Sequence, residues 1–284
     1  MNIQVIGNCQ ARPLSALLVK MAEGCDVNEP IMLHLARPEQ SEAHLEFLSG
    51  ADLIVTQATS AAFQPQHLAS SSIKELFPEK TIVWPNCFFS GQQPYLRYFT
   101  HPDLGRLMGP WEALHDIRLH KSWLDSGRVE IESVFEIDEP YEAEIRARSL
   151  GALQQRELEC DVVLSDFIEE RMATDQLFLT FNHPTAAVLT ELSQRVASFA
   201  GLTIASRPFA GEPLGRYRVP STWSRRTSLV LQGDNWDVTT GQASPGPPQV
   251  FELEQLCSYF THLYESREIF RTMDKVRLTP DFAV

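Results

Sequence analysis

Four short apolar segments, separated from one another by helix-like stretches, restrict the fold of this chain most strongly. They cover residues 3–6, 31–36, 51–57 and 81–84. Each segment is apolar along its length rather than alternating with polar residues, which is typical of parallel strands buried on both faces. Because strands that alternate with helices form α/β folds, residues 1–110 are predicted to hold a parallel sheet flanked by helices.

Polar residues stand at the ends of three of these predicted strands. Asn8-Cys9-Gln10 follows the first strand after Gly7, Gln57 ends the third, and Asn86 follows the fourth. The carboxyl ends of parallel strands share one edge of the sheet, where open α/β sheets bind their ligands. These residues are therefore predicted to converge on one site, with Gln57 and Asn86 either donating hydrogen bonds to an oxyanion or capping strand ends.

Cys9 lies where the first strand turns into a helix that is predicted over residues 11–20. The free N–H groups and the positive end of a helix N-terminus favour an anion and lower the pKa of a thiol. Cys9 is therefore a candidate catalytic nucleophile, and the alternative is a small buried side chain that fills the turn. Asn8, Gln10 and Arg12 are predicted to bind the anionic part of a cofactor at the same turn.

A second concentrated motif, Asn182-His183-Pro184, follows the apolar residues 177–179 and precedes a helix predicted over 185–199. Proline restricts the residue before it to extended backbone and is favoured in the first turn of a helix. His183 is therefore held on a stiff junction, which suits a general base that Asn182 or a nearby carboxylate would orient. The alternative is a structural histidine at a helix start.

The middle of the chain is less regular. Residues 88–110 are rich in aromatics, glycine and proline, and they are predicted to form a loop that walls or covers the site. A helical insertion is predicted at about 111–174, within a catalytic α/β domain that spans residues 1–200.

Residues 201–284 are predicted to form an irregular C-terminal extension, rich in arginine and proline, which ends in a helix over 251–276 packed on the body. Its arginines could hold phosphate groups, or they could lie on an ordinary solvated face. Five of them lie close together in the sequence: Arg207, Arg216, Arg218, Arg225 and Arg226.

The composition disfavours several kinds of partner. The net charge of −13 at pH 7, from 24 Lys and Arg against 37 Asp and Glu, argues against nucleic acid. No apolar run approaches the ~18 residues of a membrane span, and no secretory signal precedes the first strand. The five cysteines are scattered without metal-ligand spacing, so we expect reduced thiols, no metal site and a cytoplasmic protein.

The chain resembles the WcbI family of polysaccharide biosynthesis proteins over about residues 1–200. The resemblance rests on Gly7-Asn8-Cys9-Gln10, Gln57, Pro85-Asn86 and Leu177-Phe178 with Asn182-His183-Pro184. It implies an acetyltransferase of capsule and related glycans, which binds coenzyme A and transfers an acetyl group to a sugar hydroxyl.

The strand-end layout is also similar to that of SGNH hydrolases and acetyltransferases, so the resemblance implies a flavodoxin/SGNH-like fold. In that comparison Cys9 stands where the nucleophilic serine would be, Gln57 and Asn86 where oxyanion donors would be, and His183 where the base would be. The chain departs from the SGNH pattern because cysteine replaces serine and glutamine replaces a glycine. In addition, no aspartate precedes His183 at the expected short spacing.

The predicted function is acetyl-CoA-dependent O-acetylation of a sugar or polysaccharide precursor, with acetyl-CoA and a glycan acceptor as partners. Either Cys9 carries the acetyl group covalently, or it shapes the site while His183 activates the sugar for direct attack. Two other functions stay open. One is an SGNH-like esterase that gives the acyl group to water, and the other is a glycan- or nucleotide-binding protein without catalysis.

Overall fold

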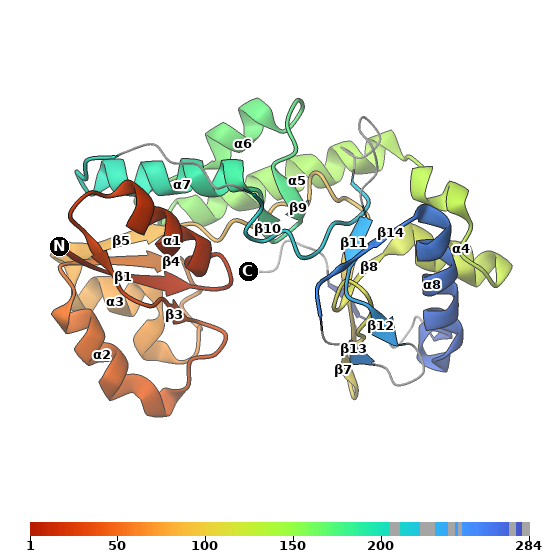
Figure 1. Ribbon diagram of the computed structural model, residues 1–284, viewed down its shortest axis with the longest axis horizontal. Coiled ribbons are helices and arrows are strands. Elements are labelled where there is room, and N and C mark those ends of the chain that lie inside the picture. The colour runs from red at the N-terminus through yellow and green to blue at the C-terminus, as the bar shows by residue number, and fades with distance from the viewer. Residues whose placement is uncertain (205–210, 222–230, 238–241, 244–245, 273–276, 280–284) are drawn as a thin grey trace.

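The computed structural model describes residues 1–204, 211–221, 231–237, 242–243, 246–272 and 277–279. It consists of two lobes with helices lying across the top of both (Figure 1). The parallel-sheet lobe is built on residues 1–84, and the antiparallel lobe is built mainly on residues 96–135 and 246–272.

The parallel-sheet lobe has the predicted α/β architecture. Its strands pair in the order β2-β1-β4-β5, all of them parallel, and β3 also pairs with β1, which is the order of flavodoxin-like folds. The strands are β1 Asn2–Gly7, β2 Asp26–Val27, β3 Ile31–Met32, β4 Leu53–Gln57 and β5 Thr81–Trp84. The strand predicted over 31–36 is thus limited to two residues, and a further short strand precedes it.

The side chains of these strands alternate between two layers of helices, because successive residues of a strand point to opposite faces. Val5 and Val55 pack with the helices α1 (Ala11–Met21) and α7 (Ala186–Phe199). Ile6 and Ile54 pack with α2 (Ser41–Gly50) and α3 (Ser70–Leu76) on the other face (Figure 1). The strands are therefore buried on both faces, as their apolar composition predicts.

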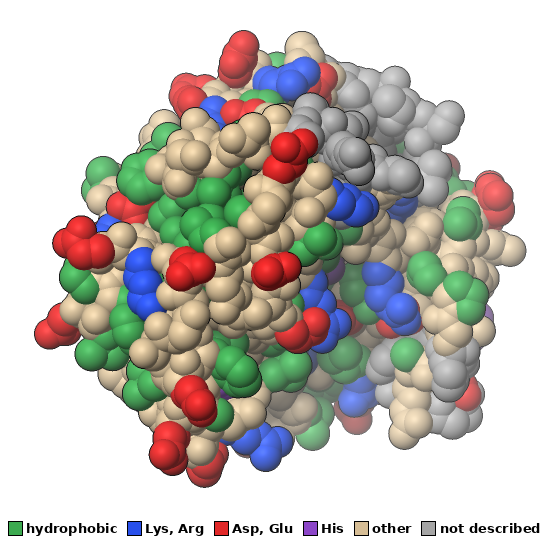
Figure 2. All heavy atoms as spheres, turned by 60° about the vertical axis from the view of Figure 1, so that its left-hand side comes forward, with side chains coloured by type: hydrophobic (Ala, Val, Ile, Leu, Met, Phe, Trp, Pro, Cys, Tyr) green, Lys and Arg blue, Asp and Glu red, His purple; other side chains and the backbone are tan. Residues whose placement is uncertain are grey.

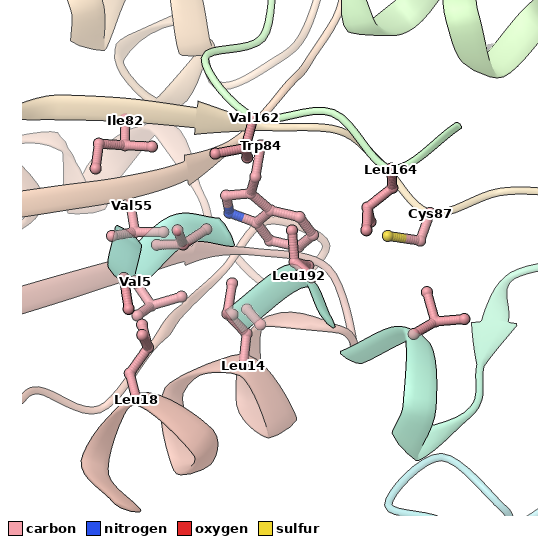
Figure 3. Packing of buried hydrophobic residues seen from close by; sticks show 14 of the residues in the cluster. Val5, Leu14, Leu18, Val55, Ile82, Trp84, Cys87, Val162, Leu164 and Leu192 are labelled. Atoms are coloured by element: carbon pink, nitrogen blue, oxygen red, sulfur yellow. The ribbon is translucent and has the colours of Figure 1, made fainter. Parts of the chain in front are cut away.

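Trp84 closes the carboxyl end of this core. Its side chain is fully buried and lies near Leu14 and Leu192 (Figure 3). A Cβ atom on Gly7 would stand 2.7 Å from Trp84 Cζ2, which is closer than two carbon atoms can approach without repulsion. Glycine therefore lets the end of β1 approach the indole, and this contact places the start of the turn that holds Cys9.

Residues 88–110 do not form the predicted loop. They contain β6 (Leu96–His101) and β7 (Gly105–Arg106), which belong to an antiparallel sheet with β8 (Leu114–Asp116) and β15 (Arg277–Thr279). The prediction is wrong because β6 pairs with a strand from the far end of the chain, and a pairing between distant residues leaves no local sequence pattern.

Two helices complete the antiparallel lobe, α4 (Ile117–Ser126) and α8 (Leu253–Glu265), and they pack against each other. The core of this lobe is rich in large aromatic side chains, including Trp111, Trp123 and Phe260. α8 is shorter than the helix predicted over 251–276. The division of the chain at residue 200 stays a prediction, but α8 shares its core with residues 96–134 rather than with the parallel sheet.

The helices α5 (Glu139–Glu157) and α6 (Ser165–Arg171) lie within the predicted helical insertion. Short antiparallel pairs are formed by β9 (Phe178–Thr180) with β10 (His183–Pro184), β11 (Leu231–Gly233) with β14 (Gln249–Phe251), and β12 (Trp236–Asp237) with β13 (Gln242–Ala243). Single 3-10 turns cover Pro38–Gln40, Gln66–Leu68, Pro78–Lys80, Ile131–Phe135 and Glu268–Arg271. In the described ranges, no helix is both long and apolar enough to cross a membrane.

Two segments of the chain pass from one core to the other. In the first segment, Phe88 packs on the core of the antiparallel lobe and Phe89 belongs to the core of the parallel-sheet lobe. In the second segment, Phe181 belongs to the core of the antiparallel lobe and Phe178 to that of the parallel-sheet lobe. The two segments are tied together by the Phe89 N–H, which donates to Phe181 O at 2.7 Å. The loop that contains His183 is therefore anchored in both cores.

Candidate active site

The turn between β1 and α1 lies at the carboxyl edge of the parallel sheet. β1 has β3 on one side and β4 on the other, so the strand order reverses at this point, where α/β sheets bind ligands. Gln10 N–H donates to Asn8 Oδ1 at 2.9 Å, and Asn8 N–H donates to Gln57 Oε1 at 3.0 Å. The backbone around Cys9 is thus held both by the turn itself and by the neighbouring strand.

Gln10 is a fully buried bridge at the centre of the site. Its Nε2 donates to Cys87 O at 2.9 Å and to Asn182 O at 3.0 Å. Its Oε1 accepts from Cys87 N–H at 3.1 Å and from Gln57 Nε2 at 3.2 Å. One amide therefore fixes the start of α1, the segment after β5 and the loop before β10 relative to one another. These contacts make Gln10 a positioning residue and leave its side chain no free group for the predicted cofactor binding.

Gln57 and Asn86, the two predicted oxyanion donors, differ in what their amides can offer. Gln57 is buried, and its Nε2 donates to Gln10 Oε1 at 3.2 Å and to Asn86 Oδ1 at 3.5 Å. Asn86 Oδ1 also accepts from Asn8 Nδ2 at 3.3 Å, which leaves Asn86 Nδ2 without a partner among the described residues. Asn86 therefore keeps a donor for a substrate, whereas Gln57 and Asn8 use their amides to hold the turn.

Cys9 is half-buried, and burial together with the Glu112 carboxylate raises the pKa of its thiol to about 11. The backbone N–H groups of Cys9 and Gln10 favour the thiolate, as the position at a helix start predicts, but their effect on the pKa is smaller. The thiol is therefore protonated near neutral pH. This corrects the prediction of a lowered pKa, because the loss of hydration at the packed turn outweighs the helix terminus.

His183 lies at the start of β10, and burial lowers its pKa to about 4, so the imidazole is neutral at pH 7. Its Nδ1 is buried and has no hydrogen-bond partner in the part of the chain that the structure describes. Asn182, one predicted orienting group, instead accepts from Thr180 Oγ1 at 2.8 Å and donates to Tyr98 OH at 3.1 Å. The His183 ring is therefore positioned by the hairpin of β9 and β10, and no acid among the described residues is hydrogen-bonded to its Nδ1.

Three residues that the sequence analysis misses reach the site from outside the parallel-sheet lobe. Tyr217 OH lies 3.3 Å from Glu112 Oε1 and 3.0 Å from Asp234 Oδ2. The Tyr217 ring is nearly parallel to the ring of His183, with centroids 6.2 Å apart. Glu112 has a positive φ of 57°, which is uncommon outside glycine and often marks a functional site. No local sequence pattern distinguishes these residues.

The predicted anion-binding arginines are only partly described. Arg12 is exposed on the first turn of α1, and Arg216 forms an ion pair of 2.6 Å with Asp234. Within the described ranges, no group of three or more His, Cys, Asp or Glu side chains could hold a metal ion. Outside the described residues lie Arg207, Arg225 and Arg226.

Comparison with known proteins identifies the family. A family model described as polysaccharide biosynthesis enzyme WcbI matches residues 2–204, which is most of the chain. The chain belongs to the WcbI family. The resemblance predicted from the motifs is thus confirmed, and the WcbI family is one of polysaccharide biosynthesis enzymes.

A solved structure of WcbI is similar to this chain with a TM-score of 0.69 and 20% sequence identity, over 96% of this chain and 92% of that chain. At this identity the likeness shows the shared fold. That WcbI structure is described as the native protein without a disulfide bond between coenzyme A and a cysteine. No curated protein matches the chain.

Proposed function

We propose that this WcbI-family member transfers an acetyl group from acetyl-CoA to a hydroxyl group of a sugar or polysaccharide precursor. The observation that carries the proposal is the buried bridge of Gln10, which joins the Cys9 turn to the loop before His183 through Asn182 O at 3.0 Å. This bridge supports a shared site for the Cys9 thiol, the neutral imidazole of His183 and the free amide of Asn86. Acyl transfer needs a base and an oxyanion donor in such an arrangement.

Acetyl-CoA is the proposed donor because of the charges on the α1 side of the site. Coenzyme A carries phosphate groups, and the first turn of α1 offers a helix N-terminus together with the exposed Arg12. Lys and Arg side chains also stand beside a hollow in the face shown in Figure 2. The description of the WcbI structure names coenzyme A and a cysteine, and Cys9 is the half-buried cysteine of this edge.

In the proposed reaction, the acceptor hydroxyl attacks the carbonyl carbon of the thioester. The new C–O bond forms and the C–S bond breaks, while His183 takes the hydroxyl proton and returns it to the departing sulfur of coenzyme A. A neutral imidazole can accept this proton at pH 7. Asn86 Nδ2 and the Cys9 backbone N–H are the donors proposed for the oxygen that becomes negative.

Direct transfer is favoured over an acetyl-Cys9 intermediate. A thiolate rather than a thiol attacks a carbonyl carbon, and burial keeps the Cys9 thiol protonated near neutral pH. Cys9 would then line the site beside the thioester. An acetyl adduct on Cys9 during turnover, detected by mass spectrometry of the intact protein, would show the covalent route instead.

Donor binding is tested by the melting temperature in the presence of coenzyme A, acetyl-CoA or nucleotide sugars. A ligand that binds only the folded state stabilises it by ~2.7 kcal/mol at 100 times its Kd, so both forms of coenzyme A are expected to raise Tm. Arg12→Ala should reduce this shift. Arg148→Ala, at an exposed arginine paired with Glu144 on α5, should leave it unchanged.

The absence of any shift with coenzyme A or acetyl-CoA would contradict the proposal. A shift with nucleotide sugars alone would favour the alternative of a glycan- or nucleotide-binding protein without catalysis.

A further inference from the structure

The aromatic ring of Tyr217 lies beside the imidazole of His183. The two rings are inclined by 12° to each other and their centroids are 6.2 Å apart, a separation at which aromatic pairs interact. His183 Nδ1 is buried and has no hydrogen-bond partner among the described residues. In this part of the chain the imidazole is thus held by ring packing, whereas the histidine of a catalytic triad is oriented by a hydrogen-bonded acid.

The hydroxyl group of Tyr217 is held by two carboxylates. It lies 3.0 Å from Asp234 Oδ2 and 3.3 Å from Glu112 Oε1, so its single proton can serve a hydrogen bond to either oxygen. Arg216 forms an ion pair of 2.6 Å with Asp234, which offsets the charge of the nearer carboxylate. Tyr217 is only 4% exposed and belongs to the core of the antiparallel lobe. The position of its ring is therefore fixed by that lobe.

The backbone that carries Tyr217 is also tied to the antiparallel lobe. Arg218 and Gln232 exchange two backbone hydrogen bonds of 2.8 and 2.9 Å, so the chain beside Tyr217 is paired with β11. Asp234 N–H, just after β11, donates to Pro110 O at 2.7 Å. Backbone and side chain are thus both anchored, and a side chain held in this way offers its neighbour a rigid surface.

We propose that Tyr217 is a positioning residue for His183, whose imidazole it holds in one orientation by ring packing. The hairpin of β9 and β10 fixes the backbone of His183, and the flat face of Tyr217 restricts the rotation of the imidazole about its own side-chain bonds. The consequence for catalysis rests on the proposed function, whereas the contact between the rings does not. A catalytic group displaced by ~1 Å can slow a reaction ~100-fold, so a fixed imidazole favours proton transfer.

The contact is tested by NMR of protein with labelled histidine, in which the His183 signal is the one that disappears in His183→Gln. A nuclear Overhauser effect between the ring protons of Tyr217 and His183 is expected in the wild type. Its absence would overturn the proposal and leave the proposed function untouched. Because the measurement uses the wild-type protein, it does not depend on the folding of a Tyr217 variant.

The same signals give the effect of the ring on the titration of His183. Burial lowers the pKa of His183 to about 4, and Tyr217→Ala opens a space through which water reaches the imidazole. The midpoint is therefore expected to rise by about 1 unit or more toward the value of ~6.5 for a solvated histidine. Tyr217→Phe keeps the ring and should keep the midpoint. An unchanged midpoint in Tyr217→Ala would contradict the packing role.

The role in catalysis is tested by the kinetics of both variants with acetyl-CoA and a panel of sugars and nucleotide sugars. Tyr217→Ala is expected to lower kcat about 30-fold or more and to change the KM for acetyl-CoA less than about threefold. Tyr217→Phe should stay within about threefold of the wild-type kcat, because the ring is kept and Asp234 keeps its ion pair with Arg216. Equal losses in both variants would overturn the proposal, since the hydroxyl and not the ring would then be required.

The matched control is Tyr259→Ala. Tyr259 packs on the same core, but its ring lies against Phe251, with centroids 5.8 Å apart. Its kcat and its His183 midpoint should equal those of the wild type, and a loss as large as that of Tyr217→Ala would overturn the proposal. A wild-type protein that transfers no acetyl group would count against the proposed function, and the Overhauser effect and the midpoint would still decide whether Tyr217 holds His183.

Discussion

Gln10 satisfies four polar groups with one buried side chain. The groups are Cys87 O, Cys87 N–H, Asn182 O and Gln57 Nε2. A buried polar group that loses its partner costs about 1–3 kcal/mol, so the removal of this amide is more harmful than the loss of one ordinary hydrogen bond. The geometry of the site therefore depends on a residue that need not touch the substrate.

Gln10→Met keeps the approximate length of the side chain but removes its amide. It is expected to lower the free energy of unfolding by about 3 kcal/mol or more, because four groups lose a partner in a dry setting. Urea denaturation measures this loss. Gln66→Met serves as the control, since the exposed amide of Gln66 makes one hydrogen bond to Ser72 and should cost about 0.5 kcal/mol or less. Equally small losses in both variants would contradict the bridging role.

Cys9, Asn86 and His183 can be predicted as site residues from the sequence. Each has a side chain that can act as a nucleophile, a hydrogen-bond donor or a base, and each lies at the end of a predicted strand or beside a proline. Glu112 is not predicted from the sequence, since its left-handed backbone and its hydrogen bond with Tyr217 both follow from how the antiparallel lobe folds. The raised pKa of Cys9 cannot be predicted from the sequence for a similar reason. A helix start is a local feature, but burial belongs to the folded molecule.

Among the elements, α7 begins with a cap that comes from a distant part of the chain. Its N-cap residue, Thr185, makes no side-chain capping bond, and Glu212 Oε2 accepts from Ala186 N–H at 2.6 Å instead. A carboxylate at this end of a helix also interacts favourably with the helix dipole. Because α7 follows His183 directly, this contact links residues 211–221 to the proposed base.

Glu212→Ala is expected to destabilise the protein by about 1 kcal/mol, as the loss of a helix cap does. The loss should be local, so hydrogen exchange should quicken at residues 186–189 more than in the rest of α7. Glu170→Ala, at an exposed glutamate of α6, should change neither quantity. Unaltered exchange at the start of α7 in the Glu212 variant would show that the helix does not depend on this cap.

The parallel strands are predictable because burial on both faces makes them apolar along their length, and the glycine and polar residues at their ends mark where they stop. The strands of the antiparallel lobe cannot be predicted in this way. β6 mixes apolar residues with Arg97, Thr100 and His101, and its partner β15 lies near the C-terminus. Its aromatic core also draws on residues far apart in sequence, so no local window contains the signal.

For the molecule as a whole, buried histidines make stability depend on pH. Burial lowers the pKa of His115 to about 3 and that of His183 to about 4, and it also lowers the pKa of His120. An unfolded histidine titrates near pH 6.5. Below this pH the unfolded chain binds protons that the folded chain does not bind, so the stability present above pH 6.5 is lost progressively as the pH falls.

The melting temperature is therefore expected to fall by about 4 °C or more between pH 6.5 and pH 5, as calorimetry would measure it. His115→Gln removes one of these groups and should make the dependence on pH shallower, whatever its effect on Tm at pH 7. A melting temperature that stays constant over this range would mean that the histidines are not buried as neutral groups.

The most direct test of acetyl transfer to a sugar uses acetyl-CoA with a labelled acetyl group. The protein is incubated with this donor and a panel of sugars and nucleotide sugars, and the label is traced to sugar, water or protein. The label is expected in a sugar ester that mild base releases, with the rate reduced about 100-fold or more in His183→Ala and largely kept in Cys9→Ala. Label recovered only as free acetate, or no transfer to any sugar while coenzyme A still binds, would contradict the proposed function.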